Sequence, residues 1–143
     1  MAVTKLQEIS KIYGFGESTA LALDEIDLEI EHGEFLAIMG PSGSGKSTLM
    51  NIIGLLDQPT HGMYNLDNRS VAKLRQTQRA RLRRDKIGFV FQSSNLLPRM
   101  HVLENVALPL SYKGMSVAKR LRQASDVLER VGMRDREYYF PKQ

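Results

Sequence analysis

Hydrophobic residues recur along the chain in two rhythms. Residues 6–13 and 20–30 partly alternate apolar and polar positions, which is typical of strands with one buried face. Residues 35–39 and 87–91 are short, almost continuous apolar runs, which predict strands buried on both faces. Helices are expected at 47–56, 71–85, 102–112 and 117–131, and a further short strand at 63–68. Strands that alternate with helices favour an α/β fold with a largely parallel core sheet.

The composition narrows the class of protein. With 42% hydrophobic and 25% charged residues in 143, the chain has the make-up of one globular domain. Cysteine is absent, so disulfides and thiolate metal sites are excluded, and the three histidines show no metal-ligand spacing. The N-terminal residues are too charged for a signal peptide, and every apolar run is too short to cross a bilayer. Any membrane role is therefore expected to come through a partner.

A glycine-rich segment carries the clearest chemistry. Gly40-x-x-x-x-Gly45-Lys46-Ser47 matches the phosphate-loop pattern, with an apolar run before it and a helical pattern after it. Glycines let successive backbone N–H groups surround a phosphate, and the positive end of the helix adds to this anion site. Lys46 supplies a cation for the β- and γ-phosphates, and the hydroxyl of Ser47 is a ligand for Mg²⁺. The predicted binding residues are Gly40, Pro41, Ser42, Gly43, Ser44, Gly45, Lys46, Ser47 and Thr48.

Positive charge gathers on one stretch of the chain. The formal net charge is +4, and eight Lys or Arg residues with a single acid, Asp85, lie between Arg69 and Lys86. Such a run can bind phosphate backbones or anionic lipid. The stretch lacks the aromatic residues that nucleic-acid modules usually add, which favours a solvated helix, and no nucleic-acid partner is expected.

Three segments in order resemble the ATP-binding domain of ABC transporters. The loop continuing into Thr48 is similar to that family's Walker A segment, residues 87–92 resemble its Q-loop with Gln92 as the glutamine, and Tyr13 sits where the family carries its adenine-stacking aromatic. The run 104–110 and the spacing to 131–133 further resemble the branch that serves macrolide export and lipoprotein release. The resemblance covers nearly the whole chain. It implies a P-loop NTPase fold of the ABC ATPase type, with a mostly parallel core sheet and an N-terminal antiparallel β subdomain.

The resemblance also implies roles for two residues outside the phosphate loop. Tyr13 would stack on adenine, whereas a tyrosine near a strand end is by itself more often partly buried packing. Gln92 would complete the Mg²⁺ coordination or hold the attacking water, and is assigned with Lys46 to catalysis; the alternative is a loop hydrogen bond. The region after Gln92 would receive a transmembrane permease at the cytoplasmic face of the membrane, and two ATP-binding domains would pair as a homodimer.

The family pattern is incomplete within these residues. Downstream of the phosphate loop we find no Leu-Ser-Gly-Gly-Gln type loop, no apolar strand ending in Asp-Glu and no switch histidine. Residues 1–143 are therefore expected to be the N-terminal portion of a single ATP-binding domain, incomplete at its C-terminus. ATP hydrolysis is expected from the family, but this chain alone is expected to hydrolyse near background, because the general base and the partner's signature loop are missing.

Several functions remain to be compared. The leading hypothesis is the ATP-binding subunit of an ABC transporter that couples ATP binding and hydrolysis to a permease. The alternatives are a nucleotide-binding fragment without hydrolytic activity and a DNA-associated ABC-type ATPase. A small-molecule kinase or GTPase is disfavoured, since no Asn-Lys-x-Asp guanine reader is present.

Overall fold

The computed structural model describes residues 2–16, 18–93 and 95–143, and the chain folds as two compact units. The first unit extends to Gly88 and the second begins at Phe89. The strands are β1 (Ala2–Phe15), β2 (Ser18–Glu31), β3 (His61–Leu66) and β4 (Arg69–Ser70). The helices are α1 (Lys46–Ile53), α2 (Gln76–Lys86), α3 (Val102–Ser111), α4 (Val117–Arg130) and a 3₁₀ turn, η1 (Arg134–Arg136).

The first unit is built on an antiparallel sheet with the order β2-β1-β3-β4. Strands β1 and β2 form a long hairpin, and β3 pairs with the other edge of β1. Asp67 and Asn68, both at positive φ, turn β3 into β4, as the Asp-Asn pair predicted. The expected N-terminal antiparallel subdomain is thus present.

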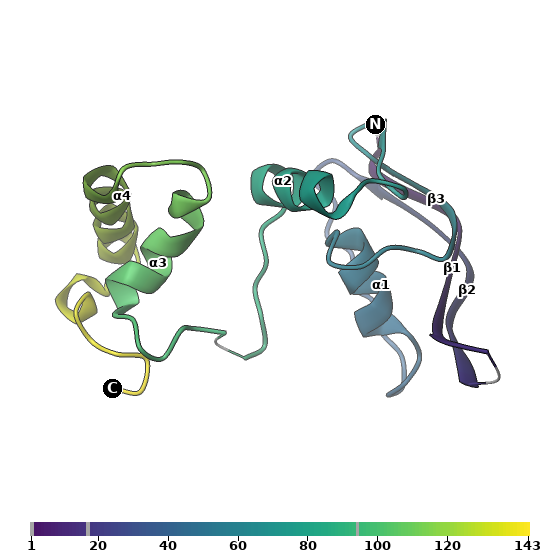
Figure 1. Cartoon of the computed structure of the whole chain (residues 1–143), viewed down its shortest axis with the longest axis horizontal. Helices are drawn as coiled ribbons and strands as arrows, with labels where there is room; N and C mark the ends of the chain where they lie inside the picture. Colours follow the sequence, from purple (N-terminus) through teal and green to yellow (C-terminus); the bar gives the residue numbers. More distant parts are fainter. Residues whose placement is uncertain (1, 17, 94) are drawn as a thin grey trace. The chain divides into compact units, whose positions relative to one another are not determined.

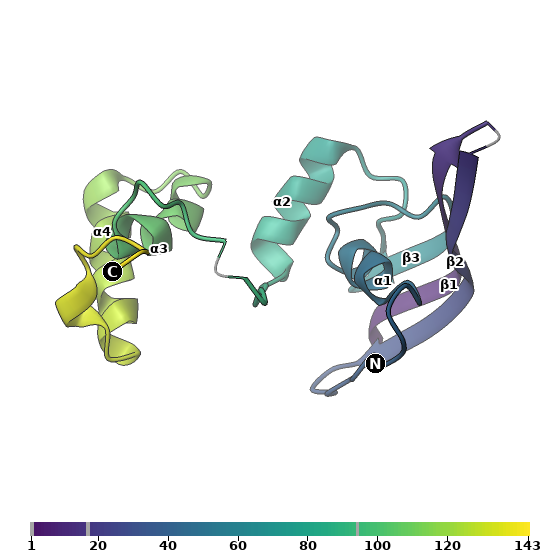
Figure 2. The same cartoon turned by 90° about the horizontal axis from the view of Figure 1, so that it is seen from below.

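Helix α1 covers one face of this sheet, and the turned view shows it end-on against β1 and β3 (Figures 1 and 2). Leu49 and Ile52 of the helix are buried together with sheet residues such as Leu6, Ile9 and Tyr64. The helix predicted from the apolar spacing of residues 47–56 is therefore confirmed. It begins at Lys46 and ends at Ile53. This packing fixes the start of α1 against the sheet.

The second unit is a helical hairpin. Leu103 and Ala107 of α3 pack on Ala124 and Leu128 of α4. The bounds of both helices lie close to the predicted ranges. The chain after α4 then returns to the first turn of α3, where the backbone N–H of Val102 donates to Tyr139 and that of Leu103 to Glu137. These bonds satisfy N–H groups that have no acceptor inside the helix.

The two expected parallel strands and the expected start of the basic helix are wrong. Residues 35–39 and 87–91 are irregular segments and not strands, so the parallel part of the core sheet does not form among the described residues. Phe35 and Met39 are 94% and 87% exposed. A parallel strand needs a partner strand distant in sequence, and neither segment is paired with a described strand. Helix α2 also begins at Gln76, because Val71 is buried in the core and its N–H bonds Tyr64 of β3.

Candidate functional site

The phosphate loop leads directly into α1. Residues 42–45 form turns and bends, and Gly45 caps the helix in the left-handed conformation, with φ of 86°. The N–H groups at the start of a helix have no intrahelical acceptor and lie at the positive end of its dipole. Because Leu49 and Ile52 anchor α1 in the core, this positive end has a fixed position, as an anion site requires.

Position 45 requires a glycine because of close packing as well as because of its positive φ value. A Cβ atom at this position would lie 2.4 Å from the carbonyl oxygen of Ala22 and 2.9 Å from Leu23 Cδ2. Both residues belong to β2, so the loop touches the sheet at this point. The glycine therefore lets the loop approach the β1–β2 hairpin.

Lys46 is folded over its own loop. Its ammonium donates to the carbonyl oxygen of Pro41 at 2.6 Å and to the hydroxyl of Ser44 at 3.2 Å. A phosphate bound by the loop would offer charged acceptors in exchange for these neutral ones, and charge-assisted hydrogen bonds are the stronger kind. The Lys46 ammonium thus lies next to the loop and is placed to contact a phosphate bound there.

Ser47 and Thr48 lie in the first turn of α1, with Ser47 exposed and Thr48 half-buried. Within the part of the chain that the structure describes, no group of three His, Asp or Glu residues is arranged to hold a metal ion. The hydroxyl of Ser47 fits a hard cation that takes its other ligands from phosphate oxygens and water. The donor set therefore suits Mg²⁺ bound together with a nucleotide.

Tyr13 lies near the end of β1, in the same unit as the phosphate loop, and its side chain is 42% exposed. Its hydroxyl donates to Asp57 at 2.9 Å, and the ammonium of Lys11 lies 4.8 Å from the ring centroid. The connected ends of β1 and β2 and the loop before α1 lie toward the same end of the unit (Figure 1). Sequence reasoning missed Lys11 and Asp57, which lie 46 residues apart and carry no motif.

Gln92 belongs to the second unit and lies in a bend after the exposed Phe91. Its role in binding Mg²⁺ or water stays a prediction. In the segment after it, Ser94 is outside the described residues. The side-chain amide of Asn105 on α3 holds the next part, donating to the carbonyl oxygens of Leu97 and Met100. Leu96 and Leu97 are nearly half exposed there, so the segment presents apolar groups as the sequence predicted.

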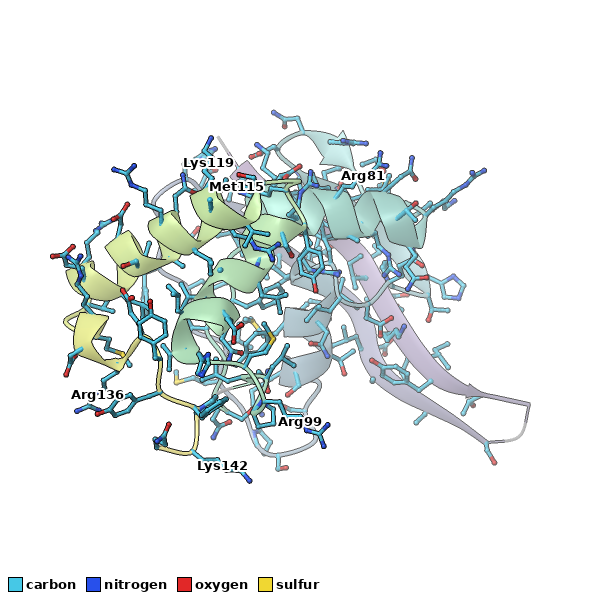
Figure 3. All side chains as sticks on the ribbon, turned by 60° about the vertical axis from the view of Figure 1, so that its left-hand side comes forward. Arg81, Arg99, Met115, Lys119, Arg136 and Lys142 are labelled. Carbon is cyan, nitrogen blue, oxygen red and sulfur yellow. The ribbon has the colours of Figure 1, made fainter. Side chains whose placement is uncertain are left out.

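Several basic side chains of helix α2 are paired with carboxylates or a carbonyl oxygen. Lys86 bonds Asp67, Arg84 bonds Asp85, and the guanidinium of Arg83 donates to the carbonyl oxygen of Leu55. The exposed Arg81 extends outward from α2 (Figure 3), whereas the guanidinium of Arg79 is partly buried. This arrangement supports the interpretation of α2 as a solvated surface helix.

The described helices include none that is both long enough and apolar enough to cross a bilayer.

The chain is similar to several known proteins. The chain is 52% identical over 139 residues to the macrolide export ATP-binding/permease protein MacB of Marinobacter nauticus, covering 97% of this chain and 22% of that protein. It is 50% identical over 136 residues to the ABC transporter ATP-binding protein YvrO of Bacillus subtilis, covering 95% of this chain and 59% of the relative. The chain thus spans about three fifths of the shorter relative and about a fifth of the longer one.

A solved structure confirms the expected fold of the ABC ATPase type, although the parallel part of the core sheet is not formed among the described residues. The ATP-binding cassette MJ0796, in a dimeric post-hydrolysis state bound to ADP and Pi, superposes with a TM-score of 0.86 at 44% identity. The match covers 98% of this chain and 62% of that one. The family model described as ABC transporter matches residues 23–143, which include the phosphate loop and Gln92. The chain therefore belongs to the ABC transporter family, whose ATP-binding domains hydrolyse ATP.

Proposed function

We propose that this chain binds ATP together with Mg²⁺ through its phosphate loop and Tyr13. The observation that carries the proposal is the loop itself, where a glycine-capped helix start and the Lys46 ammonium converge on residues 40–47. The solved cassette that it resembles is bound to ADP and Pi, which supports a nucleotide as the ligand here.

Each part of the site has a role in this binding. Backbone N–H groups of the loop and Lys46 take up the phosphates, and Ser47 holds Mg²⁺ against them. Tyr13 stacks on the base, a contact worth about 1–3 kcal/mol by analogy with other base–aromatic stacks. When bound, Mg²⁺ would supply charge neutralisation for phosphoryl transfer, and Gln92 is the residue that would position water or complete its coordination.

For the complete protein we propose the ATP-binding subunit of a transporter of the export or lipoprotein-release type. The names of the relatives support this, because MacB is an ATP-binding/permease protein for macrolide export. The segment around Leu96 and Leu97 would contact the permease at the cytoplasmic face of the membrane. The ATP-binding domains would pair as a homodimer, which the dimeric structure of the MJ0796 cassette supports.

A second candidate is nucleotide binding without hydrolysis. No apolar run ending in an Asp-Glu pair follows the phosphate loop within the 143 residues, since Asp24-Glu25 lies before that loop in β2, and residues 35–39 have no partner strand among the described residues. We expect phosphate release by this chain alone to stay near the uncatalysed rate.

The test is a titration of Mg·ATP against the wild type and Lys46→Ala. Loss of a charge-assisted bond of about 1.5–3 kcal/mol lowers affinity by about tenfold to a hundredfold. Lys73→Ala is the matched control, since Lys73 is exposed and its loss changes the net charge equally. Unchanged affinity in Lys46→Ala would refute the phosphate-loop assignment, and an equal loss in Lys73→Ala would show an effect of net charge alone.

A further inference from the structure

A side-chain cluster next to the proposed base site joins β1 to the segment that follows α1. Asp57 accepts from the Tyr13 hydroxyl on one carboxylate oxygen, at 2.9 Å, and from the Lys11 ammonium on the other, at 2.8 Å. Lys11 also donates to the carbonyl oxygen of Gln58 at 2.7 Å. Thr60 adds a further tie, because its hydroxyl accepts from the N–H of Ile12. The end of β1 is thereby connected to the chain that leaves α1.

The cluster is more enclosed than a surface ion pair. The side chains of Lys11 and Asp57 are only 13% and 32% exposed. Burial by itself would raise the pKa of Asp57, but hydrogen bonds from Lys11, Gln58 and Tyr13, with the charge of Lys11, hold that pKa below its ordinary value. Asp57 therefore stays an anion that accepts from both neighbours.

This arrangement holds the Tyr13 ring at two places. Its hydroxyl is bonded to Asp57, and the Lys11 ammonium lies against the ring at 4.8 Å from the centroid, within cation–π range. A tyrosine held only at its backbone would choose among several rotamers. With Lys11 on one face of the ring, the opposite face is the one left for a nucleotide base.

Strand register places this ring near the phosphate loop. A Cβ on Gly45 would contact Ala22 and Leu23 of β2, and Leu23 pairs with Lys11, while Tyr13 pairs with Ala20. Two residues along β1 and one step across the sheet correspond to about 8 Å between backbones. The backbone of Tyr13 therefore lies close to the part of β2 that the phosphate loop touches at Gly45.

We propose that Asp57 and Lys11 are positioning residues that orient the Tyr13 ring to stack on the base of the bound nucleotide. The inference rests on the proposed nucleotide binding and adds residues that act through Tyr13. It separates base recognition, which depends on the cluster, from phosphate recognition, which depends on Lys46 and the loop.

The experiment compares Mg·ATP with magnesium tripolyphosphate, which offers the phosphates without a base. Tyr13→Phe keeps the ring and removes the hydroxyl, and Asp57→Asn keeps the shape and removes the charge. We expect each to weaken Mg·ATP by roughly threefold to tenfold, and to leave tripolyphosphate within about twofold, because each loses part of a stacking contact. The double variant should be no weaker than the weaker single variant, because both changes break the same contact.

Asp67→Asn is the matched control, because it removes an aspartate that is ion-paired with Lys86 in the same unit. Its affinity for both ligands should equal that of the wild type. Equal weakening of both ligands by Asp57→Asn would show a merely structural tie and overturn the proposal, as would unchanged affinity for Mg·ATP in both cluster variants. If Asp57→Asn does not fold, Tyr13→Phe decides the question alone.

The wild type separates the positioning role from the proposed function. Binding of tripolyphosphate with no gain for Mg·ATP would overturn the positioning role and keep the phosphate loop. Binding of neither ligand would refute the proposed function, and the positioning role would fall with it.

Discussion

Replacing Gly45 by alanine tests the contact between the phosphate loop and the β1–β2 hairpin. At φ of 86° an alanine costs about 1–2 kcal/mol in backbone strain, partly offset by about 0.4–1 kcal/mol from the stiffer unfolded chain. The new Cβ would also lie 2.4 Å from the carbonyl oxygen of Ala22. Moving it to a normal contact requires a shift of nearly 1 Å, for which overpacking of about 1–3 kcal/mol is typical. Gly45→Ala should therefore destabilise the chain by about 2–4 kcal/mol.

Gly43→Ala is the matched comparison. Gly43 has φ of 81°, but a Cβ there would meet nothing within 4 Å. It should lose only the strain, about 1 kcal/mol or less after the offset. Urea unfolding without nucleotide measures both, and a difference of about 1–3 kcal/mol between the variants shifts the midpoint by roughly 1 M. Equal midpoints for Gly43→Ala and Gly45→Ala would refute the close approach of the loop to β2.

Three further predictions concern the core, a pH effect and the exposed apolar segment. Burial raises the pKa of Tyr64 to about 12, so its stabilisation is complete below about pH 10, the unfolded value, and is lost as the pH rises toward 12. Tyr64→Phe leaves the carbonyl oxygen of Ile53 without its 2.7 Å hydrogen bond. The variant should be less stable than the wild type by about 1–2 kcal/mol at pH 7 in thermal unfolding, and this difference should become smaller above pH 10. A difference in stability that stays constant with pH would contradict this. The pKa of Asp57 is lowered, so its stabilisation is present above about pH 4 and is lost as the pH falls through the folded value. The unfolding midpoints of the wild type and Asp57→Asn should differ at pH 7 and draw together as the pH falls below about 4, and a gap that does not narrow in acid would refute the ion pair with Lys11. Phe35→Ser should change the unfolding free energy by less than about 0.5 kcal/mol and reduce self-association in light scattering, since Phe35 is 94% exposed; a loss above about 2 kcal/mol would show that Phe35 is buried.

The local features of this chain were predictable from sequence because short-range rules govern them. The loop from Gly40 to Ser47 carries its own pattern, and the Asp67-Asn68 turn follows from two residues that tolerate positive φ. The residues of helix α4 show clear helical spacing, and its predicted bounds lie close to the observed ones. In each case the deciding contacts lie within a few residues along the chain.

The failures come from contacts that a local pattern does not encode. The apolar runs at 35–39 and 87–91 have the composition of central strands, but a strand forms only where other strands pair with it. Val71 reads as the start of a helix, yet it is buried against the sheet before α2 begins. The bond between Lys11 and Asp57 depends on how the end of α1 returns to β1, so it becomes visible only in the folded structure.

The most direct test of nucleotide binding follows the backbone amides of the ¹⁵N-labelled chain by NMR during a titration with Mg·ATP. We expect saturable shifts in the phosphate loop, from Gly43 to Ser47, and at Tyr13, and Lys46→Ala should need about tenfold to a hundredfold more ligand to produce the same shifts. Shifts confined to other parts of the chain, such as α2 or α4, would contradict nucleotide binding at the phosphate loop, and so would the absence of any saturable shift.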